Sequence, residues 1–158
     1  MEALVVYYSR TGTTRKLAEV IANKLDGDIE EIVDNKSRRG SFKYLKSGFE
    51  ALRCKIEEIN DPKKDPADYD IVILGTPVWA HRMSTPLRSY LHRMKDRIDE
   101  AAFFCTYDMS GSKSTFRDMS KVLSLSPISK LALKSVDFED ERYDSKLDRF
   151  VSEILDYF

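Results

Sequence analysis

A short segment near the N-terminus combines hydroxyl side chains with a glycine and leads directly into a helical pattern. Four of its six residues carry a hydroxyl group, although an ordinary helix cap needs only one. Backbone N–H groups at the start of a helix attract anions, and Ser and Thr hydroxyls add hydrogen-bond donors. The segment therefore predicts a phosphate-binding loop. Its residues are Ser9, Arg10, Thr11, Gly12, Thr13 and Thr14.

The same loop does not match the common phosphate-binding motifs. It lacks the G-x-x-x-x-G-K-[ST] pattern of nucleotide hydrolases and the G-x-G-x-x-G pattern of dinucleotide-binding proteins. Ser9 and Arg15 do match the spacing of a phosphatase loop, which places its nucleophile ahead of an arginine. That loop uses cysteine, because a thiolate forms far more readily than an alkoxide, and no histidine is near in this sequence to act as a base. Phosphate binding without phosphatase chemistry is the favoured interpretation.

Aromatic residues occur in two further segments that follow predicted strands. Gly75 to Pro86 contains Trp79, the only tryptophan of the chain, and Thr106 to Ser112 contains Tyr107. A tryptophan in a loop, away from the apolar stripe of an element, is suited to stacking on a planar ring. Ligands of open α/β sheets bind beyond the carboxyl ends of the strands. The three segments together therefore predict a pocket for a planar heterocycle that carries a phosphate.

Apolar segments of strand length alternate with helical patterns along the chain. This alternation is typical of βαβ units and a parallel sheet. The predicted strands cover Ala3–Tyr8, Asp28–Val33, Ile71–Gly75, Ala101–Thr106 and about Lys130–Phe138. The predicted helices cover about Thr13–Leu25, Phe42–Ile56, a segment from Ser84 to Met94, a segment from Ser112 or Ser114 to Leu123, and Asp144–Tyr157. Five strands and five helices in 158 residues predict a single α/β domain over residues 1–158.

The composition is typical of a globular protein. The chain carries 26 Lys and Arg against 27 Asp and Glu, a formal net charge of -1, and 42% of its residues are hydrophobic. This apolar content excludes a disordered chain, and no apolar run approaches the ~20 residues that a membrane-spanning helix needs. The N-terminal segment MEALVVYYSR lacks the basic region of a signal peptide, so we expect a cytoplasmic protein.

Metal, disulfide and nucleic-acid functions have little support in the sequence. Cys54 and Cys105 lie far apart and form no Cys-x-x-Cys motif. His81 and His92 are too few and too isolated to build a metal site. The pI of about 6.2 is far below the value of above about 9 that is typical of nucleic-acid-binding domains. We therefore expect no metal, no nucleic-acid partner and two reduced thiols.

Two sequence blocks together resemble the flavodoxin family. VVYYSRTGTTRKLAEVIA resembles the first strand, phosphate loop and first helix of flavodoxins, whose loop typically reads [T/S]-x-T-G-x-T. GTPVWAHRMSTPLRSYL is similar to the flavin-contacting loop and third helix of a short-chain flavodoxin branch common in bacteria and archaea. The resemblance implies a flavodoxin-like three-layer sandwich, in which a five-stranded parallel sheet of order 2-1-3-4-5 has helices on both faces. It also implies flavin mononucleotide (FMN) as the cofactor.

The resemblance further implies which residues hold the cofactor. The hydroxyl-rich loop from Ser9 to Thr14 would bind the phosphate. The residues on one side of the isoalloxazine ring would be Thr76, Pro77, Val78, Trp79 and Ala80. Those on the other side would be Thr106, Tyr107 and Asp108. In the third block Tyr107-Asp108-Met109 precedes Ser110-Gly111-Ser112, a departure from the Thr-Ser-Gly-Gly-Ser-like run of this branch.

Charged residues are unevenly distributed along the chain. From Lys36 to Lys55 seven bases stand against one acid, a balance of +6 that would suit an acidic partner. From Asp137 to Asp156 eight acids stand against three bases, a balance of -5. Arg82 and Arg88 lie on or just after the predicted flavin loop. Cations beside a flavin would stabilise its reduced anion and raise its reduction potential.

Three functions remain open at the level of the sequence. The first is an electron-transfer flavoprotein that uses FMN to pass electrons between redox protein partners. The second is an FMN-dependent oxidoreductase that takes hydride from NAD(P)H and reduces a quinone-type acceptor, with Arg82 or His81 contacting a negatively charged substrate. The third is a binding module that keeps the fold without flavin, which the intact hydroxyl-rich loop argues against. In the first two the chemistry is on the flavin, so no catalytic side chain is expected.

Overall fold

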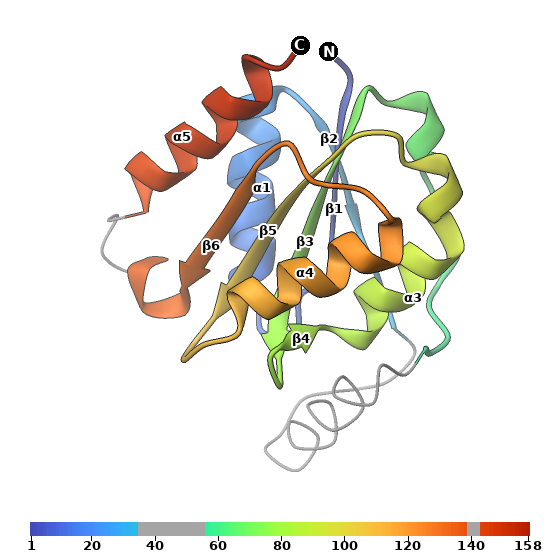
Figure 1. Ribbon diagram of the computed structural model, residues 1–158, viewed down its shortest axis with the longest axis horizontal. Coiled ribbons are helices and arrows are strands. Elements are labelled where there is room, and N and C mark those ends of the chain that lie inside the picture. Colours follow the sequence, from blue (N-terminus) through green and yellow to red (C-terminus); the bar gives the residue numbers. More distant parts are fainter. Residues whose placement is uncertain (35–55, 139–142) are drawn as a thin grey trace.

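The protein contains a parallel β-sheet with helices on both faces (Figure 1). A computed structural model describes residues 1–34, 56–138 and 143–158. The parallel strands are β1 (Ala3–Tyr7), β2 (Asp28–Glu31), β3 (Ile71–Trp79), β5 (Ala101–Tyr107) and β6 (Lys130–Lys134). Their order is β2-β1-β3-β5-β6, which confirms the order predicted for the five parallel strands. A two-residue strand, β4 (Arg82–Met83), pairs antiparallel with β3.

Four helices of the described residues form the two outer layers. They are α1 (Thr13–Leu25), α3 (Thr85–Met94), α4 (Ser112–Leu123) and α5 (Asp144–Leu155). Short 3₁₀ turns are η1 (Pro66–Asp68), η2 (Lys95–Arg97) and η3 (Ser135–Phe138). The start of α1 at Thr13 is where the sequence predicted it. The helix predicted for Phe42–Ile56 lies outside the described residues, apart from Ile56, and so does the basic segment Lys36–Lys55.

The sheet separates two apolar layers of the core. Buried side chains of α1 and α5 pack on one face, and those of α3 and α4 pack on the other. All five residues of β1 are buried, as expected for a central parallel strand covered on both sides. Figure 1 shows both chain termini at one end of the sheet and β4 at the other. The loops at the β4 end follow the carboxyl ends of the parallel strands, where this class of fold binds ligands.

Strand β3 is longer than predicted. It continues from Gly75 to Trp79 because β4 turns back and pairs with it, with Val78 opposite Met83 and Trp79 opposite Arg82. The hairpin lacks the Asn-Gly or Asp-Gly signal that usually marks such a turn in a sequence. Strand β6 is shorter than predicted, because the chain leaves the sheet after Lys134 and forms η3.

Gly75 makes the closest contact in the centre of the sheet. It is paired with Phe104 on β5, and a Cβ atom at Gly75 would lie 2.0 Å from Cζ of that ring. Phe104 is itself fully buried among the core residues beneath α1 and α5, so its ring has little room to move. The absence of a side chain at position 75 therefore lets the ring lie flat against the strand.

We expect Gly75→Ala to lower the free energy of unfolding by about 1–3 kcal/mol, the usual cost of forcing extra volume into a packed core. Urea denaturation followed by far-UV circular dichroism measures the change. Phe104→Leu should lower the free energy of unfolding less in the Gly75→Ala protein than in the wild type, because the smaller side chain relieves the clash with the added methyl group. If the double variant loses the sum of the stabilities lost in the two single variants, this account of the contact is wrong.

Candidate functional site

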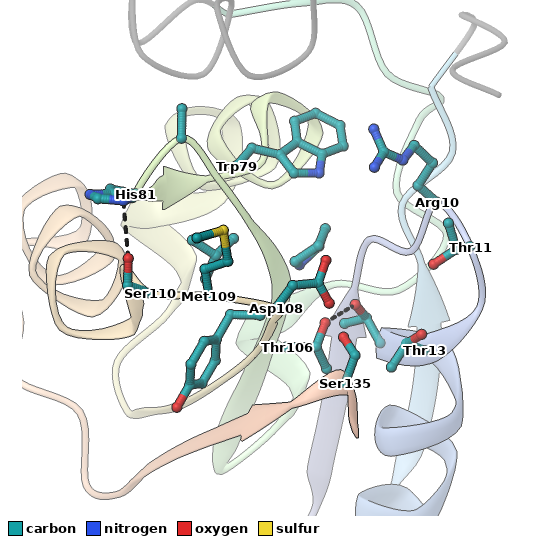
Figure 2. A pocket seen from close by; sticks show the side chains of 15 residues that line it. Arg10, Thr11, Thr13, Trp79, His81, Thr106, Asp108, Met109, Ser110 and Ser135 are labelled. Atoms are coloured by element: carbon teal, nitrogen blue, oxygen red, sulfur yellow. Dashed lines mark hydrogen bonds between the residues drawn. The ribbon is translucent and has the colours of Figure 1, made fainter. Parts of the chain in front are cut away.

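A cavity of about 480 Å³ lies at the carboxyl ends of β1, β3 and β5 (Figure 2). Its walls come from the loop before α1, the β3–β4 hairpin and the loop between β5 and α4, with one residue from the segment after β6. The volume is within the roughly 300–1,000 Å³ of ordinary ligand pockets. The lining residues are Arg10, Thr11, Thr13, Thr14, Pro77, Val78, Trp79, Ala80, His81, Thr106, Tyr107, Asp108, Met109, Ser110 and Ser135.

The start of α1 is arranged as an anion site. Gly12 occupies the N-cap position with φ 101°, a left-handed conformation that glycine adopts without strain. No described side chain caps this helix, and its first turn contains no acid, so its N–H groups and positive dipole end remain directed at the cavity. Thr11 and Thr13 line the cavity beside these groups. The arrangement can bind a phosphate.

Two other residues of the loop have structural contacts. Ser9 Oγ accepts a hydrogen bond from the backbone N–H of Gly12 at 3.1 Å, which closes the turn. Ser9 and Gly12 do not line the cavity, whereas Thr14 does. Thr14 is buried, and its Oγ1 lies 2.7 Å from Thr106 Oγ1 on β5. This bond fixes the phosphate-binding loop to the neighbouring wall of the cavity.

Trp79 is in a different position from the one that the sequence predicted. It belongs to β3 rather than to a loop, and its side chain is only 3% exposed. Its ring meets Tyr8 edge-to-face, with 5.5 Å between the centroids, and the Arg10 guanidinium carbon lies 5.4 Å from its centroid. The expectation of an open loop tryptophan was wrong, because pairing with β4 draws Trp79 into the sheet. The residue still lines the cavity, as part of a packed wall.

The tip of the β3–β4 hairpin is bound to the loop before α4. Ala80 and His81 both have positive φ values, 46° and 64°, although neither is glycine. Ser114 Oγ donates a hydrogen bond to the His81 carbonyl at 2.7 Å, and Ser110 Oγ lies 3.2 Å from His81 Nε2. A Cβ atom at Gly111 would lie 2.8 Å from His81 Cα, so the two loops pack backbone to backbone. Together they form one continuous wall.

Thr76 lies behind the cavity. It is fully buried, and its Oγ1 bonds to Ser84 Oγ at 3.0 Å and accepts from the Ser84 N–H at 3.0 Å. The hydroxyl therefore secures the start of α3 and does not line the cavity. Pro77 and Val78, which follow it on β3, do line the cavity, as predicted for the second loop.

The third predicted segment supplies Thr106, Tyr107 and Asp108 to the cavity wall. Burial raises the pKa of Tyr107, with smaller contributions from Cys105 and Asp137, so its phenol is neutral at ordinary pH. Four further lining residues were not among the predicted site residues. Met109 and Ser110 could have been found from their place after a predicted strand, whereas Ser135 was hidden because β6 was expected to continue past it. These four residues are His81, Met109, Ser110 and Ser135.

Arg82 and Arg88 are not cavity cations. Arg88 Nη2 donates to Asp118 Oδ2 in a buried pair, and Arg82 Nη1 lies 3.4 Å from Asp118 Oδ1. Neither arginine lines the cavity. The expectation that they lie beside the flavin site was wrong, because both point from the hairpin and α3 toward α4. The charged residues that line the cavity are Arg10 and Asp108, of opposite sign.

Comparison with solved structures defines the fold. A flavoprotein from Lactobacillus acidophilus NCFM, solved in complex with FMN, superposes with a TM-score of 0.71 and 23% identity over 90% of this chain and 98% of that chain. Oxidised flavodoxin 1 from Bacillus cereus superposes with a TM-score of 0.61 and 18% identity, over 100% of this chain and 99% of that chain. A flavodoxin from the domain Archaea superposes with a TM-score of 0.59 and 16% identity, over 99% of this chain and 95% of that chain.

The chain has the flavodoxin fold. Its sequence matches no family profile and no curated protein. The predicted three-layer flavodoxin-like architecture is therefore confirmed by structure, over nearly the whole length of these flavodoxins.

The described residues offer neither a membrane-spanning helix nor a metal site. No described helix is long and apolar enough to cross a membrane. Residues 1–34, 56–138 and 143–158 contain no cluster of His, Cys, Asp and Glu that could hold a metal ion. Cys105 is fully buried, and burial raises the pKa of its thiol, so it is unreactive as a nucleophile. Cys54 lies outside the described residues.

Proposed function

We propose that this protein is a single-domain, cytoplasmic flavoprotein that binds FMN and transfers electrons between redox partners. The observation that carries the proposal is the uncapped start of α1, which faces a cavity at the carboxyl ends of β1, β3 and β5. Its amides, together with Thr11 and Thr13, suit a phosphate, and the walls on either side suit a flat ring system. The similar protein from Lactobacillus acidophilus was solved with FMN, which supports the same cofactor here.

The residues of this chain would divide the work of binding between them. Arg10, Thr11, Thr13 and Thr14 would hold the phosphate end, with Ser9 and Gly12 shaping the loop. Bound FMN supplies the electron-transfer chemistry, so the protein contributes position and polarity. The walls that would enclose the ring are Pro77, Val78, Trp79 and Ala80 on one side and Thr106, Tyr107 and Asp108 on the other. Thr76 would act from behind, by fixing the end of β3 to α3.

A titration of the purified protein with FMN, riboflavin and ATP tests the proposal. Flavin fluorescence should be quenched on binding, with FMN at least about tenfold tighter than riboflavin because only FMN carries the phosphate, and each tenfold corresponds to about 1.4 kcal/mol. ATP, which carries phosphates without a flavin ring, should not compete with FMN at comparable concentration. Equal affinity for FMN and riboflavin, or no binding at micromolar FMN, would rule out this function.

The same preparation separates the electron carrier from the NAD(P)H-dependent oxidoreductase. That alternative relied on Arg82 or His81 contacting a negatively charged substrate, but Arg82 is paired with Asp118 and His81 Nε2 is within hydrogen-bond distance of Ser110. We therefore expect NADH and NADPH to leave the bound flavin oxidised. Rapid bleaching by either nucleotide, followed by turnover of a quinone, would favour the oxidoreductase.

A further inference from the structure

The solvent-facing side of α4 carries only cations. Lys113, Arg117 and Lys121 are exposed and recur at intervals of four residues, so they form one stripe along the helix. The single acid of α4, Asp118, is buried and paired with Arg88. Like charges at this spacing destabilise a helix slightly. Only Lys121, in the last turn, is favoured by the helix dipole, so the stability of α4 does not account for the whole stripe.

The neighbouring edge strand extends this positive charge. On β6, Leu131 and Leu133 point into the core beneath α1 and α5, so Lys130 and Lys134 project toward the face that carries α4. From Met109 to Lys134 the chain contains five bases and one acid. None of the five bases forms an ion pair with a described residue. We call this set the basic face; it consists of Lys113, Arg117, Lys121, Lys130 and Lys134.

Most other cations of the described helices are paired with acids, and Lys16 on α1 is the exception. On α1, Arg15 lies 2.5 Å from Glu31 and Lys24 lies 2.8 Å from Asp148. An evenly mixed surface of this kind is the ordinary result of solvation, since the chain as a whole has nearly equal numbers of bases and acids. The basic face departs from that mixture over one helix and the strand beside it.

The basic face begins at the mouth of the cavity. Met109 lines the cavity and is 88% exposed, and Gly111, two residues later, is the N-cap of α4. Figure 1 shows α4 lying across the sheet, with its first turn near β4. Protein docking surfaces combine an apolar centre with a charged rim. Met109 and the row of cations that follows it on α4 provide both.

We infer that Met109 and the basic face form the docking surface for an acidic one-electron redox protein that exchanges electrons with the flavin. This inference rests on the proposed FMN function. In each encounter one electron leaves the partner's reduced redox centre, which is oxidised, and enters the flavin, which is reduced; the reverse transfer uses the same surface. A nucleic-acid partner is disfavoured, because Phe116, the only aromatic residue of α4, is buried and offers no ring for base stacking.

The test measures electron transfer from a reduced acidic [2Fe–2S] ferredoxin to the FMN-loaded protein by stopped-flow absorbance. The variant K113Q/R117Q/K121Q keeps good helix formers on α4. We expect its second-order rate constant to fall at least about tenfold at low ionic strength, since electrostatic steering raises association rates by 10-fold or more. Its rate should also depend less on salt than that of the wild type. An unchanged rate and an unchanged salt dependence would overturn the inference.

The matched control is K16Q/K24Q/K63Q, which removes the same charge from exposed lysines of α1 and of the segment just before η1. Its rate should stay close to that of the wild type. An equal loss in both variants would overturn the inference, because net charge alone would then account for the effect. Circular dichroism and FMN affinity, measured for each variant beforehand, show that fold and cofactor binding are intact.

A second measurement distinguishes failure of the docking surface from failure of the proposed function. Isothermal calorimetry at low salt follows binding of the oxidised ferredoxin to the protein whether or not FMN is bound. If FMN does not bind, the proposed function fails, and weaker ferredoxin binding in K113Q/R117Q/K121Q would still support the docking surface. If that variant binds ferredoxin like the wild type but loses affinity for a DNA duplex, the surface serves nucleic acid and the inference is wrong.

Discussion

Replacing Asp118 with alanine is expected to lower the free energy of unfolding by about 3–5 kcal/mol, the range for removing one partner of a buried ion pair. The Arg88 and Asp118 side chains are 4% and 5% exposed, and Arg88 Nε has no hydrogen-bond partner among the described residues. An arginine stays charged under all ordinary conditions. Without Asp118 its charge would remain buried between α3 and α4 with no counter-charge. Urea denaturation measures the loss.

Two further variants separate the buried charge from lost packing. Arg82, whose side chain is 41% exposed, contacts the same carboxylate, so Arg82→Gln should cost no more than about 1 kcal/mol. The double variant Arg88→Met/Asp118→Leu replaces the pair with apolar groups of similar size and should recover most of the stability lost in Asp118→Ala. A loss below about 1 kcal/mol in Asp118→Ala would show that the pair has little energetic weight.

Replacing Thr13 with aspartate is expected to weaken FMN binding by at least about 100-fold while leaving the fold as stable as before or slightly more so. Two unit charges about 4 Å apart repel by about 4 kcal/mol at the effective dielectric of a protein surface, more than the 2.7 kcal/mol or so that 100-fold requires. The same aspartate would lie in the first turn of α1, which contains no acid, where the helix dipole favours it by about 0.3–1 kcal/mol.

Weaker FMN binding without a loss of stability distinguishes charge repulsion at the site from general damage to the fold. Fluorescence titration gives the FMN affinity and thermal unfolding gives the stability. Thr13→Asn is the matched control, because it has nearly the same shape as aspartate without the charge, and should retain most of the affinity. Riboflavin, which lacks the phosphate, should bind Thr13→Asp about as well as it binds the wild type. Equal losses for both ligands would place the phosphate away from Thr13.

The hydroxyl-rich loop before α1 and the start of that helix could be predicted because their signals are local. Gly12, the hydroxyls around it and the apolar stripe of Thr13–Leu25 all lie within a few turns of chain, and α1 begins at the expected residue. The alternation of strands and helices was equally readable, because burial on both faces of a parallel sheet demands apolar strands. The order of the strands came from the resemblance to flavodoxins, since strands far apart in the sequence leave no local record of which pairs with which.

The wall that holds Trp79 could not be predicted in the same way. Ala80 and His81 turn with positive φ, without the glycine or asparagine that would announce the turn. They are kept there by Ser110, Gly111 and Ser114, about thirty residues later in the chain. A tryptophan predicted for an open loop is therefore a buried strand residue.

The sequence by itself determined the class of fold, the place of the hydroxyl-rich loop before α1 and the uneven distribution of charge, because each depends on residues that are neighbours along the chain. The tertiary structure alone decided how the charges are used. Arg82 and Arg88 are engaged by Asp118 from α4, while Lys113, Arg117 and Lys121 on the same helix face solvent. A charge has its effect through what lies within a few ångströms in space, and only the packing of α3 and α4 brings those partners together.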